Sequence, residues 1–150
     1  MRFELLSLAH RLADRREPFV LATVVRREPP TSARLGDGAI ITSGGVFEGW
    51  LGGACTKDLI IAEGMAALED GTPRLVVLTA DPSREPRDGE RVLPMTCHSG
   101  GSVEVYLDPQ VVPDCIMLFG ESDVADAVAR LAHELGFRVT RDGVTAEPAV

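Results

Sequence analysis

Two cysteines of this sequence each stand close to a pair of glycines. Cys55 follows Gly52-Gly53, and Cys97 precedes Gly100-Gly101. The first pair lies between an apolar segment and residues with helical spacing, which predicts a glycine turn that opens a helix. The first turn of a helix favours an anion and lowers the pKa of a thiol, which enriches the reactive thiolate. If the two turns meet, they form a thiol-lined pocket with anion-binding amides. On its own, Cys55 is more simply explained as a small inert thiol in a tight turn.

The spacing of the cysteines excludes several other kinds of site. Cys55 and Cys97 are too far apart for a Cys-x-x-Cys zinc knuckle, and Cys115 lies in an apolar strand-like run, where we expect it in the core. His98 neighbours Cys97, but successive strand residues face opposite ways, so a catalytic Cys–His dyad is not predicted. Three widely spaced cysteines make no disulfide framework and fit a reducing cytoplasm.

Composition and charge limit the classes of partner. The chain has 150 residues, 45% apolar and 25% charged, as in a globular protein of one domain, or of one domain and part of another. Fifteen basic residues against 23 acidic ones give a net charge of −8, which argues against nonspecific nucleic-acid binding and against attachment to an anionic membrane. No apolar run is long enough to span a bilayer, and the charged first residues do not resemble a signal peptide.

The elements that must position the cysteines alternate between helices and strands. Helical spacing predicts a first helix that ends near Arg16 and a second that starts at Cys55 and ends before Gly71. In the loop 26–38, Thr31, Ser32 and Arg34 are polar side chains that could contact an anion, although solvated loop side chains are the simpler explanation. The polar residues 81–91 predict a mobile surface loop. Short β-rich runs predict strands over 19–25, 39–42, 46–50, 75–78 and 102–108. The last of them alternates, which places Glu104 and Tyr106 on the solvated face of a half-solvated strand.

The C-terminal part of the chain predicts a second domain. A proline-bounded linker, 109–114, separates a domain over residues 1–108 from a unit over residues 115–150. That unit predicts a strand, a helix capped by Ser122 and a second strand, with no clear element after residue 140. Ser122 replaces the middle glycine of the dinucleotide fingerprint and has acidic neighbours, which disfavours NAD. The predicted fold class is α/β, with a mixed β-sheet N-terminal domain and flanking helices, followed by a truncated Rossmann-like β-α-β unit.

Several motifs occur in an order that resembles a known family. They are Ala22–Arg26 with the Glu28–Arg34 loop and Gly36, then Gly49–Cys55, Pro94–Gly101 and Glu104–Tyr106. Together they resemble the xanthine dehydrogenase accessory protein family (XdhC/CoxI), the maturation factors of molybdenum hydroxylases. The two cysteine motifs are most similar to the branch associated with carbon monoxide dehydrogenase-type enzymes. Family members usually continue through a complete Rossmann domain, whereas this chain stops after its first unit.

The resemblance implies a maturation chaperone rather than an enzyme. Such a protein transiently binds a molybdopterin-type molybdenum cofactor and assists its insertion into a xanthine or carbon monoxide dehydrogenase-type hydroxylase. The implied partners are the apo molybdenum hydroxylase and a cysteine desulfurase or another cofactor-donating protein in the cytoplasm, and a homodimer is compatible with this role.

The resemblance also implies a cofactor-binding pocket. In this sequence its residues are Ser32, Arg34, Gly52, Gly53, Cys55, Thr56, Lys57, Thr96, Cys97, His98, Ser99, Gly100 and Gly101. Cys55 and Cys97 are the candidate catalytic thiols and the candidate neighbours of molybdenum, and no other metal site is implied. Two alternatives stay open: a thiol-dependent sulfur-transfer or redox enzyme of the same pathway, and a non-catalytic nucleotide-binding or interaction module.

Overall fold

The computed structural model describes residues 3–95, 100–112, 114–141 and 144–145. The chain divides into two compact units, Met1–Val111 and Val112–Val150. No helix in the described part of the chain is long and apolar enough to cross a membrane.

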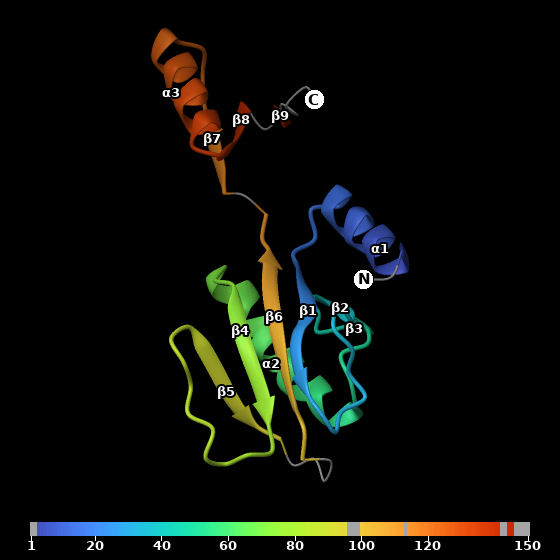
Figure 1. Ribbon diagram of the computed structural model, residues 1–150. Coiled ribbons are helices and arrows are strands. Elements are labelled where there is room, and N and C mark those ends of the chain that lie inside the picture. The colour runs from blue at the N-terminus through green and yellow to red at the C-terminus, as the bar shows by residue number, and fades with distance from the viewer. Residues whose placement is uncertain (1–2, 96–99, 113, 142–143, 146–150) are drawn as a thin grey trace. The chain divides into compact units, whose positions relative to one another are not determined.

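The first unit is built on a six-stranded sheet with two helices (Figure 1). Its strands lie in the order β3-β2-β1-β6-β4-β5. Neighbouring strands are antiparallel, except for β4 and β5, which run parallel. The elements are α1 (Phe3–Asp14), β1 (Phe19–Glu28), β2 (Gly38–Thr42), β3 (Phe47–Gly49), α2 (Ala54–Asp70), β4 (Arg74–Thr79), β5 (Glu90–Pro94) and β6 (Ser102–Gln110).

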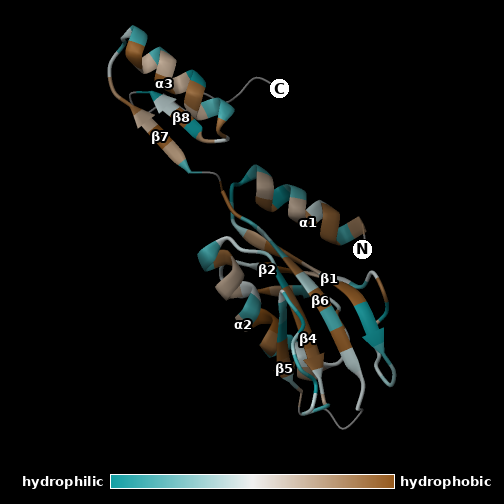
Figure 2. Cartoon of the chain, turned by 60° about the vertical axis from the view of Figure 1, so that its left-hand side comes forward, coloured by the Kyte–Doolittle hydropathy of each residue, from teal (hydrophilic) through white to brown (hydrophobic). Residues whose placement is uncertain are grey.

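Helix α2 packs against one face of this sheet and closes the main hydrophobic core. Alternate residues of the central strands point to this face, and Val20, Val76 and Val105 pack there in one buried cluster with Ile60 of the helix. Burying a side chain of this kind contributes roughly 1.5–3 kcal/mol. Hydrophobic residues concentrate accordingly in the central strands and in α2 (Figure 2). The predicted α/β class, with a mixed sheet and flanking helices, is therefore confirmed.

Helix α1 covers one end of the opposite face of the sheet. Leu5 and Leu12 of this helix pack against Phe19 and Ile40, whose side chains point away from α2. Side chains alternate along a strand, so Glu104 lies on this same face, between the core residues on either side of it in β6. The sheet therefore has an apolar face under α2 and a face whose far end carries charged groups.

Three strands differ from the sequence-based expectation. β1 continues through Glu28 into the expected loop, after a bulge between Val24 and Arg26. β6 continues through Pro109 and Gln110, two residues expected in the linker, because β1 still pairs with them. A proline is tolerated there since the ladder to β4 ends at Leu107 and leaves one side open. β5 was not among the ranges predicted as strands, although Cys97 was expected at the end of a strand; it is a short edge strand with charged residues and a proline.

The second unit contains one parallel β-α-β unit and a small added strand. β7 (Cys115–Leu118) and β8 (Arg138–Arg141) pair in parallel around α3 (Asp123–Glu134), and β9 (Val144–Thr145) adds to β8 in antiparallel fashion. The strand β9 corrects the expectation of no element after residue 140. Cys115 is exposed rather than in the core, because β7 is the edge strand of this three-stranded sheet.

Candidate functional site

One cavity gathers residues from four separate segments of the first unit. It has a volume of about 420 Å³ and is lined by Pro30, Thr31, Ser32, Gly53, Cys55, Thr56, Met95, Gly101 and Val103. We call it the Cys55 cavity. It lies on the α2 face of the sheet, since Met95 and Val103 belong to the core cluster that α2 covers.

The turn before α2 places Cys55 at this cavity. Gly49 and Gly52 have φ angles of +126° and +116°, which favour glycine, and a Cβ at Gly52 would lie 3.2 Å from the Cβ of Ala33. Gly53 is the N-cap residue of α2, and its carbonyl oxygen accepts a hydrogen bond of 2.8 Å from the hydroxyl of Thr56. Cys55 is thus the second residue of α2, half-buried, at the positive end of the helix dipole.

Gly101 brings the opposite wall of the cavity into place. A Cβ on this residue would lie 2.2 Å from the carbonyl oxygen of Pro30 and 2.6 Å from that of Glu28. Only glycine permits this approach between the start of β6 and the loop after β1. On the next wall, the backbone N–H of Met95 donates a 2.7 Å hydrogen bond to the carbonyl of Thr79, which anchors the end of β5.

The lining of the Cys55 cavity is apolar with a few hydroxyl groups and one thiol. Thr31 and Thr56 point their hydroxyls into local hydrogen bonds, Thr31 accepting from the N–H of Ala33 at 3.2 Å. No lysine, arginine or carboxylate is among the lining residues that the structure describes. An anionic group in this cavity would therefore be held by amides, hydroxyls and the helix dipole rather than by a charged side chain.

The structure brings together five of the residues predicted for the site. Ser32, Gly53, Cys55, Thr56 and Gly101 all line the Cys55 cavity, and so does Thr31, a further candidate for contact with an anion. Met95, Val103 and Pro30 were missed, because nothing in a local pattern distinguishes them from core and loop residues.

The other predicted site residues lie elsewhere or outside the description. Gly52 packs beside the cavity against Ala33, whereas Gly100 lines a different cavity. Lys57 places its Nζ 5.4 Å from the centre of the Phe47 ring, a cation–π contact, and the backbone N–H of Arg34 donates to Asp37.

Residues Thr96, Cys97, His98 and Ser99 lie outside the described part of the chain, so the meeting of Cys55 with Cys97 stays a prediction. The described residues nearest to that segment that line the Cys55 cavity are Met95 and Gly101. In the described ranges, no group of three or more His, Cys, Asp or Glu side chains is placed to hold a metal ion.

Comparison with known proteins finds a family match over part of the first unit. Residues 12–79 match the model of the XdhC and CoxI family. The matched region includes Ser32, Gly53, Cys55 and Thr56, and therefore most of one side of the Cys55 cavity.

Two further likenesses cover most of this chain but a minor part of the other protein. An Escherichia coli K12 protein, the uncharacterized protein YqeB, is 27% identical over 134 residues, which are 87% of this chain and 23% of the relative. A Bacillus halodurans protein described as a xanthine dehydrogenase has a similar fold, with a TM-score of 0.53 and 19% identity over 87% of this chain and 34% of that one. The chain thus spans less than half the length of either protein.

Proposed function

We propose that this chain binds the molybdenum cofactor and assists its insertion into a molybdenum hydroxylase of the xanthine or carbon monoxide dehydrogenase type. The family match over residues 12–79 supports a role in molybdenum hydroxylase maturation. The observation that carries the finer proposal is the convergence of Gly53, Cys55, Thr56, Ser32 and Gly101 on one cavity.

The residues present fit such a cofactor. The cavity of about 420 Å³ lies in the range of small-molecule sites, and Gly101 offers a surface without a side chain. The first turn of α2 and the Ser32 hydroxyl would hold a phosphate group, and the thiol of Cys55 would face a sulfur-rich metal centre, to which soft ligands are suited. When bound, the cofactor supplies redox chemistry to the client enzyme. The chain itself would bind the group and shield it from water.

Sulfur transfer through Cys55 is a second candidate function. Its thiol is half-buried at the second position of α2, where the helix dipole favours the thiolate. The thiolate would attack the outer sulfur of a protein persulfide, such as that of a cysteine desulfurase. The donor would leave as a thiolate, so that Cys55 carries the persulfide with no net oxidation.

The partners follow from the proposed role. We propose an apo molybdenum hydroxylase as client, a cysteine desulfurase or another cofactor-donating protein upstream, and action in the cytoplasm, with a homodimer compatible with all three.

The turn before α3 in the second unit is a weaker candidate for a nucleotide-binding site. The Ser122 hydroxyl there accepts a hydrogen bond from the N–H of Ala125, at the helix end where a pyrophosphate would bind.

A maturation assay with two cysteine variants tests the proposal. Cys55→Ala should lower the activity that the chain confers on its apo-hydroxylase client, whereas Cys115→Ala, a matched change of an exposed cysteine in the second unit, should not. Mass spectrometry for a persulfide on Cys55 separates the two candidate functions. If the Cys55→Ala variant matures the hydroxylase normally, the Cys55 cavity is not the cofactor site.

A further inference from the structure

The strand β7 forms a sheet edge that differs from the other edges of the molecule. In the described part of the chain, the two sheets end at β3, β5, β7 and β9. Proteins protect such edges from other chains by very short strands, charged residues or proline. β3 and β9 have only three and two residues, and β5 carries Glu90, Arg91 and Pro94. The sequence of β7, Cys-Ile-Met-Leu, contains neither a charge nor a proline, so its edge is open to a further strand.

The backbone of β7 shows which of its groups face outward. The N–H of Arg138 in β8 donates a 2.9 Å hydrogen bond to the carbonyl oxygen of Asp114, just before β7. Backbone groups of successive strand residues point alternately to the two sides of the strand. Those of Ile116 therefore point to β8, whereas those of Cys115 and Met117 point away from it. The outer side of β7 thus presents N–H and C=O groups to a second strand.

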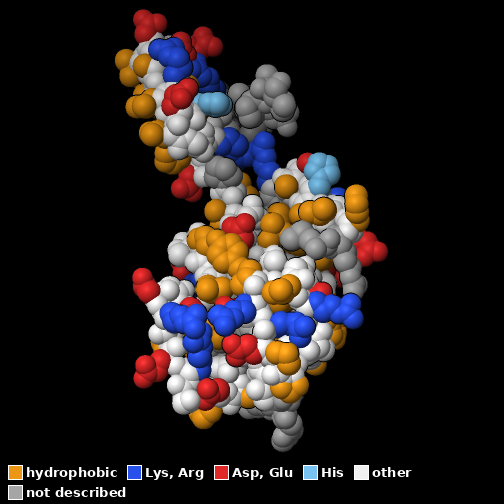
Figure 3. Space-filling model, viewed as in Figure 1, with side chains coloured by type: hydrophobic (Ala, Val, Ile, Leu, Met, Phe, Trp, Pro, Cys, Tyr) orange, Lys and Arg blue, Asp and Glu red, His pale blue; other side chains and the backbone are white. Residues whose placement is uncertain are grey.

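Helix α3 carries an apolar stripe on the same side of the second unit. The half-buried Ala125 and the buried Ala132 face the sheet, and Asp126, one position after Ala125, forms an ion pair with Arg141 of β8. Val124, one position before Ala125, therefore lies on the other side of the helix, towards the open edge of β7. Figure 3 shows hydrophobic side chains along one edge of this unit. The stripe recurs at helical spacing and is 40–72% exposed: Val124, Val128, Leu131 and Leu135.

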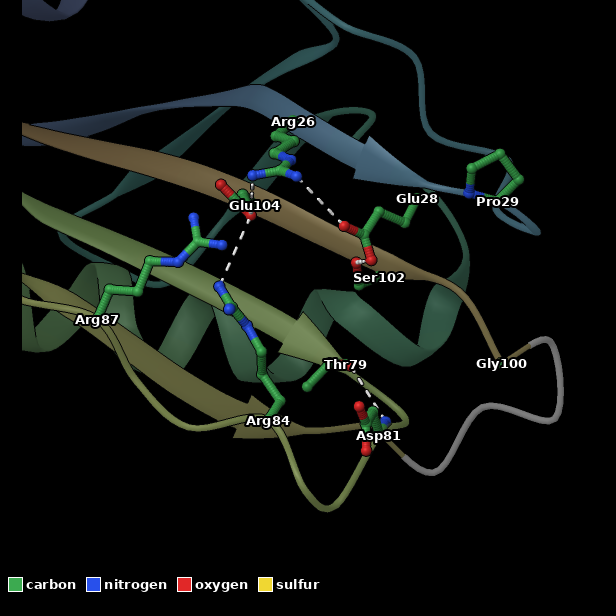
Figure 4. Close-up of a pocket in the computed structure, with 10 residues that line it drawn as sticks. All are labelled: Arg26, Glu28, Pro29, Thr79, Asp81, Arg84, Arg87, Gly100, Ser102 and Glu104. Carbon is green, nitrogen blue, oxygen red and sulfur yellow. Dashed lines mark hydrogen bonds and ion pairs between the residues drawn. The ribbon is translucent and has the colours of Figure 1, made fainter.

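The charged groups of the first unit, by contrast, find their partners within the chain. Figure 4 shows a cavity of about 250 Å³ on the sheet face that α2 does not cover, where Glu104 lies between Arg26 and Arg84, with ion-pair distances of 3.8 and 3.9 Å. Glu28 in the same cavity accepts a 3.2 Å hydrogen bond from the hydroxyl of Ser102. The β7 edge and the apolar stripe have no such partners among the described residues of the second unit.

A second copy of the second unit fits this edge in its spacing. Helix α3 contacts both β7 and β8 and so lies over this pair of strands, which are about 4.8 Å apart. If a second β7 pairs antiparallel across a two-fold axis perpendicular to the sheet, both α3 helices lie on the same face. Their axes are then about two strand spacings apart, roughly 10 Å, which is the distance at which helices pack.

The apolar stripe is also complementary to itself. In an antiparallel pair of α3 helices centred between Ala129 and Arg130, Val124 lies opposite Leu135 of the other copy, and Val128 lies opposite Leu131. Each contact thus joins a smaller and a larger side chain. The stripe and the edge of β7 would bury on the order of 500 Å² per copy, or about 1,000 Å² in total, which is the lower limit for a specific interface.

We propose that β7 and the apolar stripe of α3 form the interface of a symmetric homodimer of this chain. The two three-stranded sheets join through antiparallel β7 strands, and the two α3 helices pack side by side above the junction. The interface carries no charged side chain that would select a partner of opposite charge, which favours a second copy over a charged protein. The inference does not depend on the proposed cofactor binding, because none of these residues lines the Cys55 cavity.

Sedimentation equilibrium of the full chain tests the dimer. The measurement is made with a reducing agent, so that the exposed Cys115 forms no disulfide between copies. An interface of this size predicts reversible association with a dissociation constant in the micromolar range. A chain that stays monomeric up to about 1 mM would leave the open edge to another protein and overturns the proposal.

Two variants test where the copies meet. Leu131→Glu places a carboxylate opposite Val128 of the other copy, and Met117→Pro removes an outward N–H while the bonds of β7 to β8 remain. Each should weaken association at least tenfold. His133→Glu is the matched control, because His133 is exposed on the same helix but on the side of Asp126, and it should dimerise like the wild-type chain.

Circular dichroism checks that each variant is folded. Because Leu131 is 62% exposed, its substitution keeps the test decisive even if Met117→Pro does not fold. A dimer that the folded Leu131→Glu variant leaves unchanged, or that His133→Glu weakens equally, overturns the proposed interface.

Discussion

Replacing Gly101 by alanine should push apart the two walls that form the Cys55 cavity. The new Cβ would lie 2.2 Å from the carbonyl oxygen of Pro30 and 2.6 Å from that of Glu28. An unstrained carbon–oxygen contact needs roughly 3.3 Å, so the backbone of the loop must move by about 1 Å. Both obstacles are backbone atoms, which yield less readily than a side chain. We therefore expect a cost near the upper end of the usual range for overpacking, about 3 kcal/mol.

Thermal and urea unfolding would measure this cost. For a chain of this length, about 3 kcal/mol corresponds to a decrease in Tm of roughly 6–12 °C. Gly44→Ala is the matched control, because its φ is not positive and its nearest neighbour, Thr42 Oγ1, would lie 3.9 Å from the added Cβ. If Gly101→Ala unfolds at the same temperature and urea concentration as Gly44→Ala, the close approach of these two segments is not as described.

Three further substitutions test features outside the Cys55 cavity. Glu63→Ala should lower the free energy of unfolding by about 1.5–3 kcal/mol in urea titrations, because it removes a 3.2 Å ion pair from the largely buried guanidinium of Arg74, which keeps its bonds to Asp70 and to the carbonyl oxygen of Ala66. Hydrogen bonds donated by the residues two positions later lower the pKa of Asp70 and Asp81 below the ordinary 3.8. Their contribution is therefore complete above pH 3.8 and is lost as the pH falls through the lower folded pKa. Replacing both Asp70 and Asp81 by asparagine should therefore make the free energy of unfolding fall less steeply as the pH is lowered below 3.8. Ser122→Ala should cost α3 about 1 kcal/mol, seen as faster amide hydrogen exchange in that helix, because the change removes its N-cap.

Local patterns predicted the elements around Cys55 well. The helical spacing after Gly53 and the glycine before Thr72 bound α2, which the structure places at Ala54–Asp70 with Gly71 in the left-handed conformation. Alternation in the strand after Gly101 separated the buried valines of β6 from Tyr106, which is exposed. Such features depend on neighbouring residues only, so the sequence carries them directly.

Contacts between distant segments could not be predicted in this way. Glu104 was expected on a half-solvated face, yet it is buried, because Arg84 reaches it from a loop far away in sequence. The contact of Gly101 with Pro30 likewise joins two segments whose pairing no local pattern encodes. Cys115 was expected in a core, but the strand that carries it lies at a sheet edge. In each case the missing information is which segment packs next to which.

Binding of the molybdenum cofactor to the purified chain tests the central claim most directly. The chain would be incubated with the cofactor, freed of unbound material by gel filtration, and assayed for molybdenum and pterin per chain. The account predicts that the wild-type chain and Cys115→Ala retain the cofactor, and that Cys55→Ala retains at least tenfold less. Equal retention by Cys55→Ala and the wild-type chain, or no retention by either, would contradict it.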